Sequence, residues 1–486
     1  MTSRSPLLTL LIASTTLAGC NLAPKYVRPE GAVPPALPQG GIYPVAATDA
    51  RDITRVGWRD FFIDDRLRQV VQRGLDNNQD LALAAANVLQ ARAQYRVQRA
   101  DLLPSIAANG SATYANSATG STGVAGGTAG TPGTGTGTTG GGSNNLSIYS
   151  ATVGVSAFEL DLFGRVRSLS KAALEQYFAT EEAQRSARIS LIAEIATAWL
   201  TIAADQDQLG LSQQTLKTFD ETLRLTSAQF RIGVKSELEA RQAETNYQAA
   251  RNDIAVLQTR IAQDRNALDI LVGKPVETAL LPAALGDARA GIEVLPTDLS
   301  STVLLRRPDV LRAEHQLIAQ NANLGAARAA FFPTISLTGV LGTISTALTG
   351  LFGGGSFTYS AGSSVSLPLF DGGRNKGNLD YANASRQAAV ASYRKAVQTA
   401  FREVADALAQ RGTIDEQIAA QIARANASQV AARLSDARYR AGVDSFLTAL
   451  DAQRTAYAAQ QQLVGTRLTR GANLVELYRA LGGGLS

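Results

Sequence analysis

Two stretches of the chain alternate between apolar and small polar residues and contain no charge. Residues 102–158 and 329–370 have no Asp, Glu, Lys or Arg, although 18% of the whole chain is charged. Each stretch holds two segments of period two, which is the spacing of β-strands. The pattern predicts strands at about residues 104–115, 146–158, 333–343 and 357–369.

One face of each predicted strand is apolar, and the other carries Ser, Thr, Gly or Asn. In the second strand the apolar row continues from Tyr149 through Val153 and Val155 to Ala157. Segments of about ten residues match tilted transmembrane strands. A soluble sandwich would explain the alternation but not the missing Lys and Glu on its outer faces, so a membrane barrel is favoured. Four strands cannot close a barrel, and an open edge in lipid leaves backbone groups unpaired, which predicts two, three or four copies.

Long helices follow each strand pair. The pattern predicts helices at 165–231 and 236–272, and again at 375–440 and 445–481. The first helix of each pair contains no proline. About 60 helical residues extend over about 90 Å. Such lengths exceed those of ordinary globular helices, so the chain joins a membrane sheet to helical coils.

The chain is an internal duplication. Residues Phe230 to Ser236 return 209 residues later as Tyr439 to Ser445. The repeats are predicted at 81–272 and 306–486, with a linker at 273–305. Residues 120–145 are dominated by Gly, Thr and Ser, a composition typical of a flexible loop, and they lie at the predicted hairpin tip.

The first residues are typical of a secreted lipoprotein. Arg4 precedes an apolar run that ends in Leu17-Ala18-Gly19-Cys20, which predicts a signal peptide at 1–19. The site resembles a bacterial lipobox, which implies a lipid on Cys20 and a mature N-terminal segment at 20–80. Position 21 is Asn21 instead of the aspartate that is associated with inner-membrane retention, so the resemblance implies the outer membrane. The alternative is an unmodified cysteine.

The amino-acid composition excludes most kinds of catalytic and metal-binding chemistry. One cysteine and one histidine leave no disulfide framework and little scope for thiol, imidazole or zinc chemistry. We interpret His315 as a solvated side chain on a helix surface. The net charge of +5 is dispersed along the chain, which does not favour a nucleic-acid partner. The sequence shows no set of a nucleophile with a base, so we expect no enzymatic activity and no cofactor other than the lipid.

Several motifs resemble one family. They are the lipobox followed by Pro24-Lys25-Tyr26-Val27-Arg28-Pro29, then Gly57-Trp58-Arg59-Asp60-Phe61-Phe62, Leu305-Arg306-Arg307-Pro308-Asp309-Val310 and Leu450-Asp451-Ala452-Gln453-Arg454. Together they resemble the outer-membrane efflux factors of the TolC superfamily, in the lipoprotein branch with OprM-like and NodT-like proteins.

The resemblance implies an α+β membrane protein that forms a homotrimer. Its twelve-stranded outer-membrane β-barrel would continue as a periplasmic α-barrel, with an equatorial domain near residues 21–80, 273–305 and the C-terminus. It also implies a periplasmic adaptor and an inner-membrane RND-type pump as partners, and the export of drugs or other small toxic compounds.

The two helical turns differ in charge, which suggests a gate at the tip. Lys235 corresponds to Asp444, and Gln242 corresponds to Asp451. By resemblance, Asp451 projects into the pore as a three-fold ring, where repulsion among carboxylates favours a bound cation or arginine. The other gate residues that the resemblance implies are a latch of Tyr439 with Arg438 or Arg440, bonded to Asp205 or Asp207 on the neighbouring coil. Solvated surface charges are the alternative interpretation of all of them.

The turn glycines have a simpler role. Gly233 and Gly442 are expected to adopt positive φ, and the resemblance implies that an adaptor docks on these turns. The leading hypothesis is therefore the exit duct of a tripartite efflux pump. A passive porin, a duct for protein secretion and a structural lipoprotein are the competing hypotheses, and the sequence does not name the exported molecule.

Overall fold

The computed structural model describes residues 21–44, 56–117, 144–287 and 300–483. The predicted signal peptide at 1–19, Cys20 and most of the predicted loop at 120–145 lie outside these ranges. The chain divides into two compact units. The strand unit comprises the described residues within 1–26, 93–174 and 319–386, and the helical unit comprises those within 27–92, 175–318 and 387–486. Each unit takes parts of both sequence repeats, because the long helices run through both.

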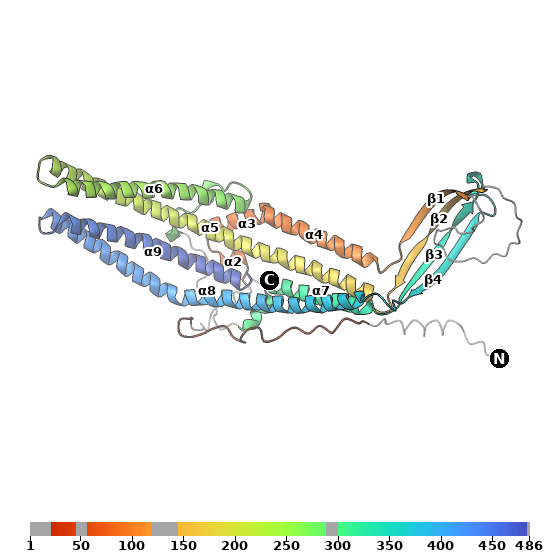
Figure 1. The fold of residues 1–486 in the computed structure, drawn as a ribbon. Helices are drawn as coiled ribbons and strands as arrows, with labels where there is room; N and C mark the ends of the chain where they lie inside the picture. Colours follow the sequence, from red (N-terminus) through yellow and green to blue (C-terminus); the bar gives the residue numbers. More distant parts are fainter. Residues whose placement is uncertain (1–20, 45–55, 118–143, 288–299, 484–486) are drawn as a thin grey trace. The chain divides into compact units, whose positions relative to one another are not determined.

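The strand unit contains one antiparallel sheet of four strands in sequence order (Figure 1). Its strands are β1 (Ile106–Ser117), β2 (Asn144–Leu160), β3 (Thr334–Ser345) and β4 (Phe357–Ser366). The predicted four-stranded sheet is therefore confirmed. Within the described ranges, strand β1 at one edge and β4 at the other each pair with a single neighbour.

The register aligns the apolar rows of all four strands on one face. Ile106 lies opposite Val155, Val153 lies opposite Leu341, and Leu341 in turn lies opposite Tyr359. Directly opposed residues of an antiparallel pair share a face. Ile106 is 73% exposed and Tyr359 77% exposed, so the described residues leave this apolar surface uncovered. Such a surface suits contact with lipid.

A β-bulge shifts the alternation in the second half of β2. Val155 pairs with Gly339, but Phe158 pairs with Leu337, so β2 contains one extra residue between these positions. Ala157 takes up the irregularity with φ of 54°. The prediction that Ala157 continues the apolar row is therefore wrong, since Phe158 takes its place there. Bulges bend and twist a strand, as closure of a barrel requires.

The opposite face of the sheet is lined by small hydroxyl groups. Ser111 and Ser150 oppose one another, with their Oγ atoms 2.8 Å apart. In all four strands the one ionisable acid or base other than tyrosine is Glu159 near the end of β2, which Arg165 binds through two hydrogen bonds. Gly154 permits a close approach of β2 and β3, because a Cβ there would lie 2.3 Å from the carbonyl oxygen of Gly339.

The helices occur in corresponding sets. Short helices α2 (Trp58–Phe61) and α3 (Asp65–Asn77) lead into α4 (Gln79–Ala100), and α7 (Pro308–Ala329) precedes β3. The long pairs are α5 (Arg165–Arg231) with α6 (Glu237–Val272), and α8 (Arg374–Arg440) with α9 (Phe446–Ala480). Helices α5 and α8 have 67 residues each, about 100 Å of helix. Short 3-10 helices lie at Thr278–Leu280, Leu285–Asp287, Ser301–Arg306 and Leu348–Gly350.

A core in the helical unit explains the most apolar part of α5. One window of this helix is long and apolar enough to cross a membrane, yet 56% of it is buried within the protein. Trp199 at its centre is fully buried, and its Nε1 donates a hydrogen bond to the carbonyl oxygen of Leu280 at 2.9 Å. Burial of this surface therefore occurs against protein.

Arg307, in the Arg-Arg-Pro-Asp motif, joins three helices of the helical unit. It is 4% exposed and lies just before α7. Its guanidinium binds Asp309 at 2.7 Å and Glu403 of α8 at 2.8 Å, and it also donates to the carbonyl oxygen of Ala480 in α9. The motif therefore serves to position helices.

His315 is not a solvated surface residue, so that interpretation is wrong. Its Nδ1 lies 2.7 Å from Oε2 of Glu175, and its ring lies 5.4 Å from that of Phe178. Both partners belong to α5, whereas His315 belongs to α7. The hydrogen bond that the imidazole makes to Glu175 raises the pKa of His315, which favours the protonated ring between the two helices.

Candidate functional site

The α5–α6 turn and the α8–α9 turn have the same backbone geometry. Gly233 and Gly442 adopt φ of 76° and 74°, which confirms the expectation of a positive φ at both. The amide of Val234 donates to the Gln229 carbonyl, and the amide of Val443 donates to the Arg438 carbonyl, each at 2.9 Å. These are Schellman closures, which satisfy carbonyl groups at the end of a helix.

Serine caps begin the returning helices. The Ser236 hydroxyl accepts a hydrogen bond from the amide of Glu239, and the Ser445 hydroxyl accepts one from the amide of Thr448. The duplicated sequence therefore builds two rigid turns by the same means. The differences between them lie in the side chains.

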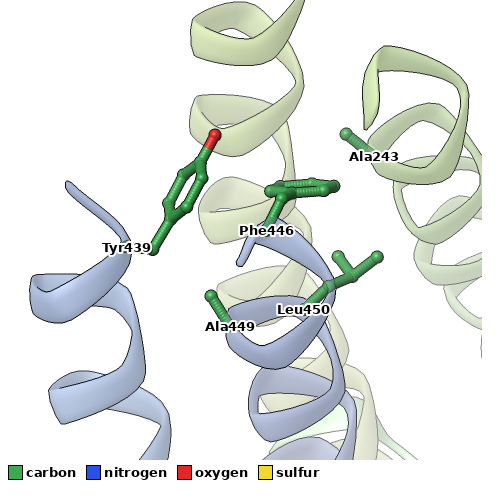
Figure 2. Packing of buried hydrophobic residues seen from close by; sticks show 5 residues of the cluster. All are labelled: Ala243, Tyr439, Phe446, Ala449 and Leu450. Carbon is green, nitrogen blue, oxygen red and sulfur yellow. The ribbon is translucent and has the colours of Figure 1, made fainter. Parts of the chain in front are cut away.

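A small apolar cluster joins the two helical pairs beside these turns (Figure 2). Tyr439 and Phe446 pack with ring centres 5.4 Å apart, and Leu223 of α5 packs against the cluster. The remaining members are Ala243 of α6 and Ala449 and Leu450 of α9. The α8–α9 pair is therefore held against the α5–α6 pair within one chain.

Tyr439 is the residue of this cluster that makes polar contact with the other helical pair. Its hydroxyl lies 3.5 Å from Oε1 of Gln229, and Nζ of Lys235 lies 4.9 Å from the centre of its ring. The side chain is 8% exposed, and burial raises the pKa of its phenol. Lys235 is also 3.8 Å from Glu239. We call Gln229, Lys235 and Tyr439 the tip contact.

Asp205 and Asp207 do not take part in the tip contact, so their assignment as latch partners is wrong. Asp205 lies 26 residues before the end of α5, about 39 Å along the helix. Its carboxylate lies 3.7 Å from the guanidinium of Arg260, and burial together with a hydrogen bond to Asp264 raises its pKa to about 6. Asp207 accepts a hydrogen bond from the amide of Leu285 at 3.0 Å.

Both arginines near Tyr439 are bound within their own helical pair. Arg438 makes two hydrogen bonds, of 2.7 and 2.9 Å, to Asp444 across the α8–α9 turn. This contact lowers the pKa of the Asp444 carboxyl. Arg440 pairs with Asp436 one helical turn away, at 2.8 Å. The charge difference between the repeats therefore gives each turn its own brace.

Asp451 is exposed on α9, less than two turns of helix after the Ser445 cap. Among the described residues it has no hydrogen-bond or ion-pair partner. It lines a groove of about 390 Å³ together with Asn246 and Asp253 of α6 and Arg454 of α9. An unpaired carboxylate on the surface is free to meet a group from outside the chain.

One polar link in the same groove has no signal in the sequence. The Tyr457 hydroxyl lies 2.7 Å from Ser212 Oγ and donates to Asp253 at 3.0 Å. These three residues belong to α9, α5 and α6, so no local spacing connects them. Burial raises the pKa of Tyr457 to about 12, which keeps the phenol protonated as a donor.

Within the described ranges, no group of three or more His, Cys, Asp or Glu side chains could hold a metal ion. The geometry thus offers braced turns, an inter-coil contact and an unpaired carboxylate.

The family model described as "Outer membrane efflux protein" matches residues 70–274 and 299–483. Two curated relatives from Pseudomonas putida are similar over the full length. The antibiotic efflux pump outer membrane protein ArpC and the toluene efflux pump outer membrane protein TtgC are each 45% identical over 480 residues, covering 98% of this chain and 95% of theirs.

A solved structure is also similar throughout. The open state of the MtrE outer membrane channel of Neisseria gonorrhoeae aligns with a TM-score of 0.81 and 38% identity. The match covers 96% of this chain and 99% of that one. The chain therefore has the fold of a known outer-membrane channel.

Proposed function

The chain belongs to the outer membrane efflux protein family, and from this premise we propose that it forms the outer-membrane exit duct of an efflux pump. The observation that carries the proposal is the sheet itself. It has an apolar face that the described residues leave uncovered and a hydroxyl-lined face without charge along most of its length, and helices of 67 residues follow β2 and β4 in the chain. This combination suits a pore that leads through lipid and onwards through the periplasm.

The duct needs several copies of the chain. Helix α4 has no buried residue along its 22 positions, and its Leu83, Leu89 and Val97 side chains are all more than 60% exposed. The outer edges of β1 and β4 have no partner strand among the residues that the structure describes. We propose the homotrimer of the resembling family, in which three such sheets make twelve strands and α4 packs against the next copy.

We propose that the closure lies at the helical turns. Asp451 has no partner among the described residues of the chain, which supports its assignment to a three-fold ring of carboxylates. The tip contact would hold the α8–α9 pair against the α5–α6 pair while the duct is closed. Arg438, Arg440 and Asp444 act in this proposal as braces of the α8–α9 pair, since each already has its partner there.

The same turns are the proposed docking site for the periplasmic adaptor. Around Gly233 and Gly442, the side chains of Ile232, Val234 and Val443 are each more than 60% exposed. Apolar side chains fixed on rigid turns favour contact with a partner protein. The further partners in this proposal are an inner-membrane RND-type pump and, through a lipid on Cys20, the outer membrane.

The cargo that we propose is small antibiotics or organic solvents, as the names of ArpC and TtgC state for those proteins. The hydroxyl-lined face of the sheet supports this proposal, since it offers neither an attractive nor a repulsive charge to a passing molecule.

Single-channel recordings in planar bilayers test the duct and its closure together. We expect small, cation-selective currents from the purified protein, because a ring of carboxylates attracts cations. In the double variant Asp451→Ala and Tyr439→Phe we expect larger currents with less cation selectivity. Large steady currents that are the same in both proteins would instead indicate a passive porin and contradict the proposed closure.

A further inference from the structure

The helical unit contains a cavity of about 950 Å³ that the proposed duct does not use. Its walls come from α5, from the segment that leads into α7, from α2 and from the end of α9. Four arginines contribute to its lining, namely Arg28, Arg185, Arg188 and Arg306, with Glu182 as the one carboxylate. A strongly cationic cavity of this size requires an explanation.

Two of the four arginines are not neutralised. Arg185 binds Glu182 at 2.6 Å, and Arg28 binds Glu314 at 2.7 Å. Arg188 and Arg306 are exposed and have no hydrogen-bond or ion-pair partner among the residues that the structure describes. A guanidinium group remains protonated at any physiological pH. The cavity therefore presents two free cations that match the geometry of a carboxylate, sulfate or phosphate.

The rest of the wall is largely apolar. Ile189 and Ile192 of α5 face the cavity with Leu305 and Leu311, and the indole of Trp58 joins them. Ligand sites typically combine such an apolar wall with a few placed polar groups, in volumes of about 300–1,000 Å³. The cavity lies at the upper end of that range, which suits a molecule with a rigid body of several rings better than a short chain.

Glu182 does not compete for the two free arginines. The residue is 7% exposed, and Arg185 binds one of its oxygens. Its Oε2 atom is enclosed by protein, so this oxygen is out of reach of a molecule in the cavity.

We propose that this cavity binds an anionic amphiphile with an apolar, fused-ring body. Arg188 and Arg306 bind the anionic group, and the Ile, Leu and Trp58 side chains contact the ring system. The site lies outside the tip contact, and its occupancy does not depend on the proposed duct function.

Cholate has each of these features and serves as the probe. The chain contains only two tryptophans, and Trp199 is fully buried, so Trp58 provides an intrinsic fluorescence signal at the cavity. The experiment titrates cholate into the full-length protein in nanodiscs of zwitterionic lipid. We expect a saturable change in fluorescence that the Trp58→Phe variant lacks.

The decisive comparison is between two double variants of equal charge. Arg188→Gln with Arg306→Gln is expected to weaken cholate binding at least ten-fold. Arg424→Gln with Arg433→Gln removes two exposed arginines from α8, away from the cavity, and is expected to leave binding unchanged. The uncharged methyl ester of cholate is expected to bind at least ten-fold more weakly than cholate to the unmodified protein.

Three results would overturn the proposal. One is the absence of a saturable signal with cholate. The second is equal weakening in both double variants, which would indicate general attraction to a cationic protein. The third is equal affinity for cholate and its methyl ester, which would show that the arginines do not recognise the anion.

Discussion

Nζ of Lys235 lies 4.9 Å from the centre of the Tyr439 ring, so a lysine on the turn of the first repeat contacts a tyrosine of the second. The two positions are unrelated by the duplication, since Lys235 corresponds to Asp444 and Tyr439 to Phe230. Divergence between the repeats has thus produced a contact that one repeat could not make with itself.

Loss of this contact is expected to open the duct more often. Lys235→Met removes the cation above the ring, a contribution of about 0.5–1 kcal/mol at a partly exposed site. Tyr439→Ala also empties the apolar cluster and is expected to cost about 3 kcal/mol or more, as for other buried aromatic residues. Single-channel recordings should therefore show a higher open fraction for Lys235→Met and a much higher one for Tyr439→Ala.

Lys217→Met provides the matched control for the tip contact. Lys217 is an exposed lysine of α5 that lies more than three turns of helix before the end of that helix. Its substitution is expected to leave the open fraction unchanged. A response of Lys235→Met no larger than that of Lys217→Met would show that the contact does not hold the tip closed.

Substitution of the turn glycines should destabilise the protein because of their backbone conformation alone. A Cβ at Gly233 or Gly442 would meet no atom within 4 Å, so any cost comes from the positive φ. An L-residue in this conformation costs about 1–2 kcal/mol. Gly233→Ala and Gly442→Ala should each lower the free energy of unfolding by that amount in denaturant titrations.

Gly210→Ala is the control for the two turns. Gly210 lies inside α5, and a Cβ there also meets no atom within 4 Å, but its φ is not positive. Replacing a helical glycine by alanine stabilises by up to about 1 kcal/mol. The expected signs are therefore opposite at Gly210 and at the turns, and equal signs would contradict the backbone argument.

The sequence predicted those elements whose cause is local. Period-two alternation without charge predicts the strands, and a glycine followed by a serine cap predicts each helical turn. The bulge at Ala157 could not be predicted, since an alanine at positive φ has no sequence signal. Its cause is the pairing of β2 with β3, which are far apart in the chain.

The site was predicted only in part, because residue type does not fix axial position. Asp205 and Asp207 had the charge required for a latch, but they lie in the body of α5, where Arg260 and the Leu285 amide bind them. The partner of His315 was also hidden, since Glu175 lies 140 residues earlier in the chain. The contacts of Gln229 and Lys235 with Tyr439 depend on how the two helical pairs pack together, which the sequence does not specify.

The pKa of His315 should lie above the ordinary value for histidine, because its ring faces carboxylates. Glu175 binds the ring, and Glu182 and Glu314 add to the negative potential around it, so the pKa of the imidazole is raised above 6.5. The stabilisation is then fully present below pH 6.5 and is lost as the pH rises through the raised value. The sole histidine of the chain gives a single set of imidazole signals in the NMR spectrum of selectively labelled protein.

The variant Glu175→Gln keeps a hydrogen-bonding side chain but removes the nearest charge. It should lower the pKa of His315 measured in this way. A pKa at or below 6.5 in the unmodified protein would rule out the charged pair between α5 and α7.

The charged form of Asp205 should destabilise the folded protein, because this carboxylate is buried beside another carboxylate. Its pKa is raised from 3.8 to about 6 by burial and then by the hydrogen bond to Asp264, with Arg260 opposing the shift. The protonated group is therefore favoured in the folded state. Its contribution to stability is fully present below pH 4 and is lost as the pH rises through about 6.

Asp205→Asn removes this penalty while keeping a group that can bond to Asp264. Two pKa units correspond to about 3 kcal/mol, and sharing of the proton with Asp264 makes a gain of about 1–3 kcal/mol the expected result at pH 8. At pH 4 the variant and the unmodified protein should be equally stable. Asp406→Asn, at a carboxylate whose side chain is 76% exposed, should change stability little at either pH. Denaturant titrations at both pH values measure the difference, and a loss of stability at pH 8 in Asp205→Asn would show that the ion pair with Arg260 outweighs the cost of burial.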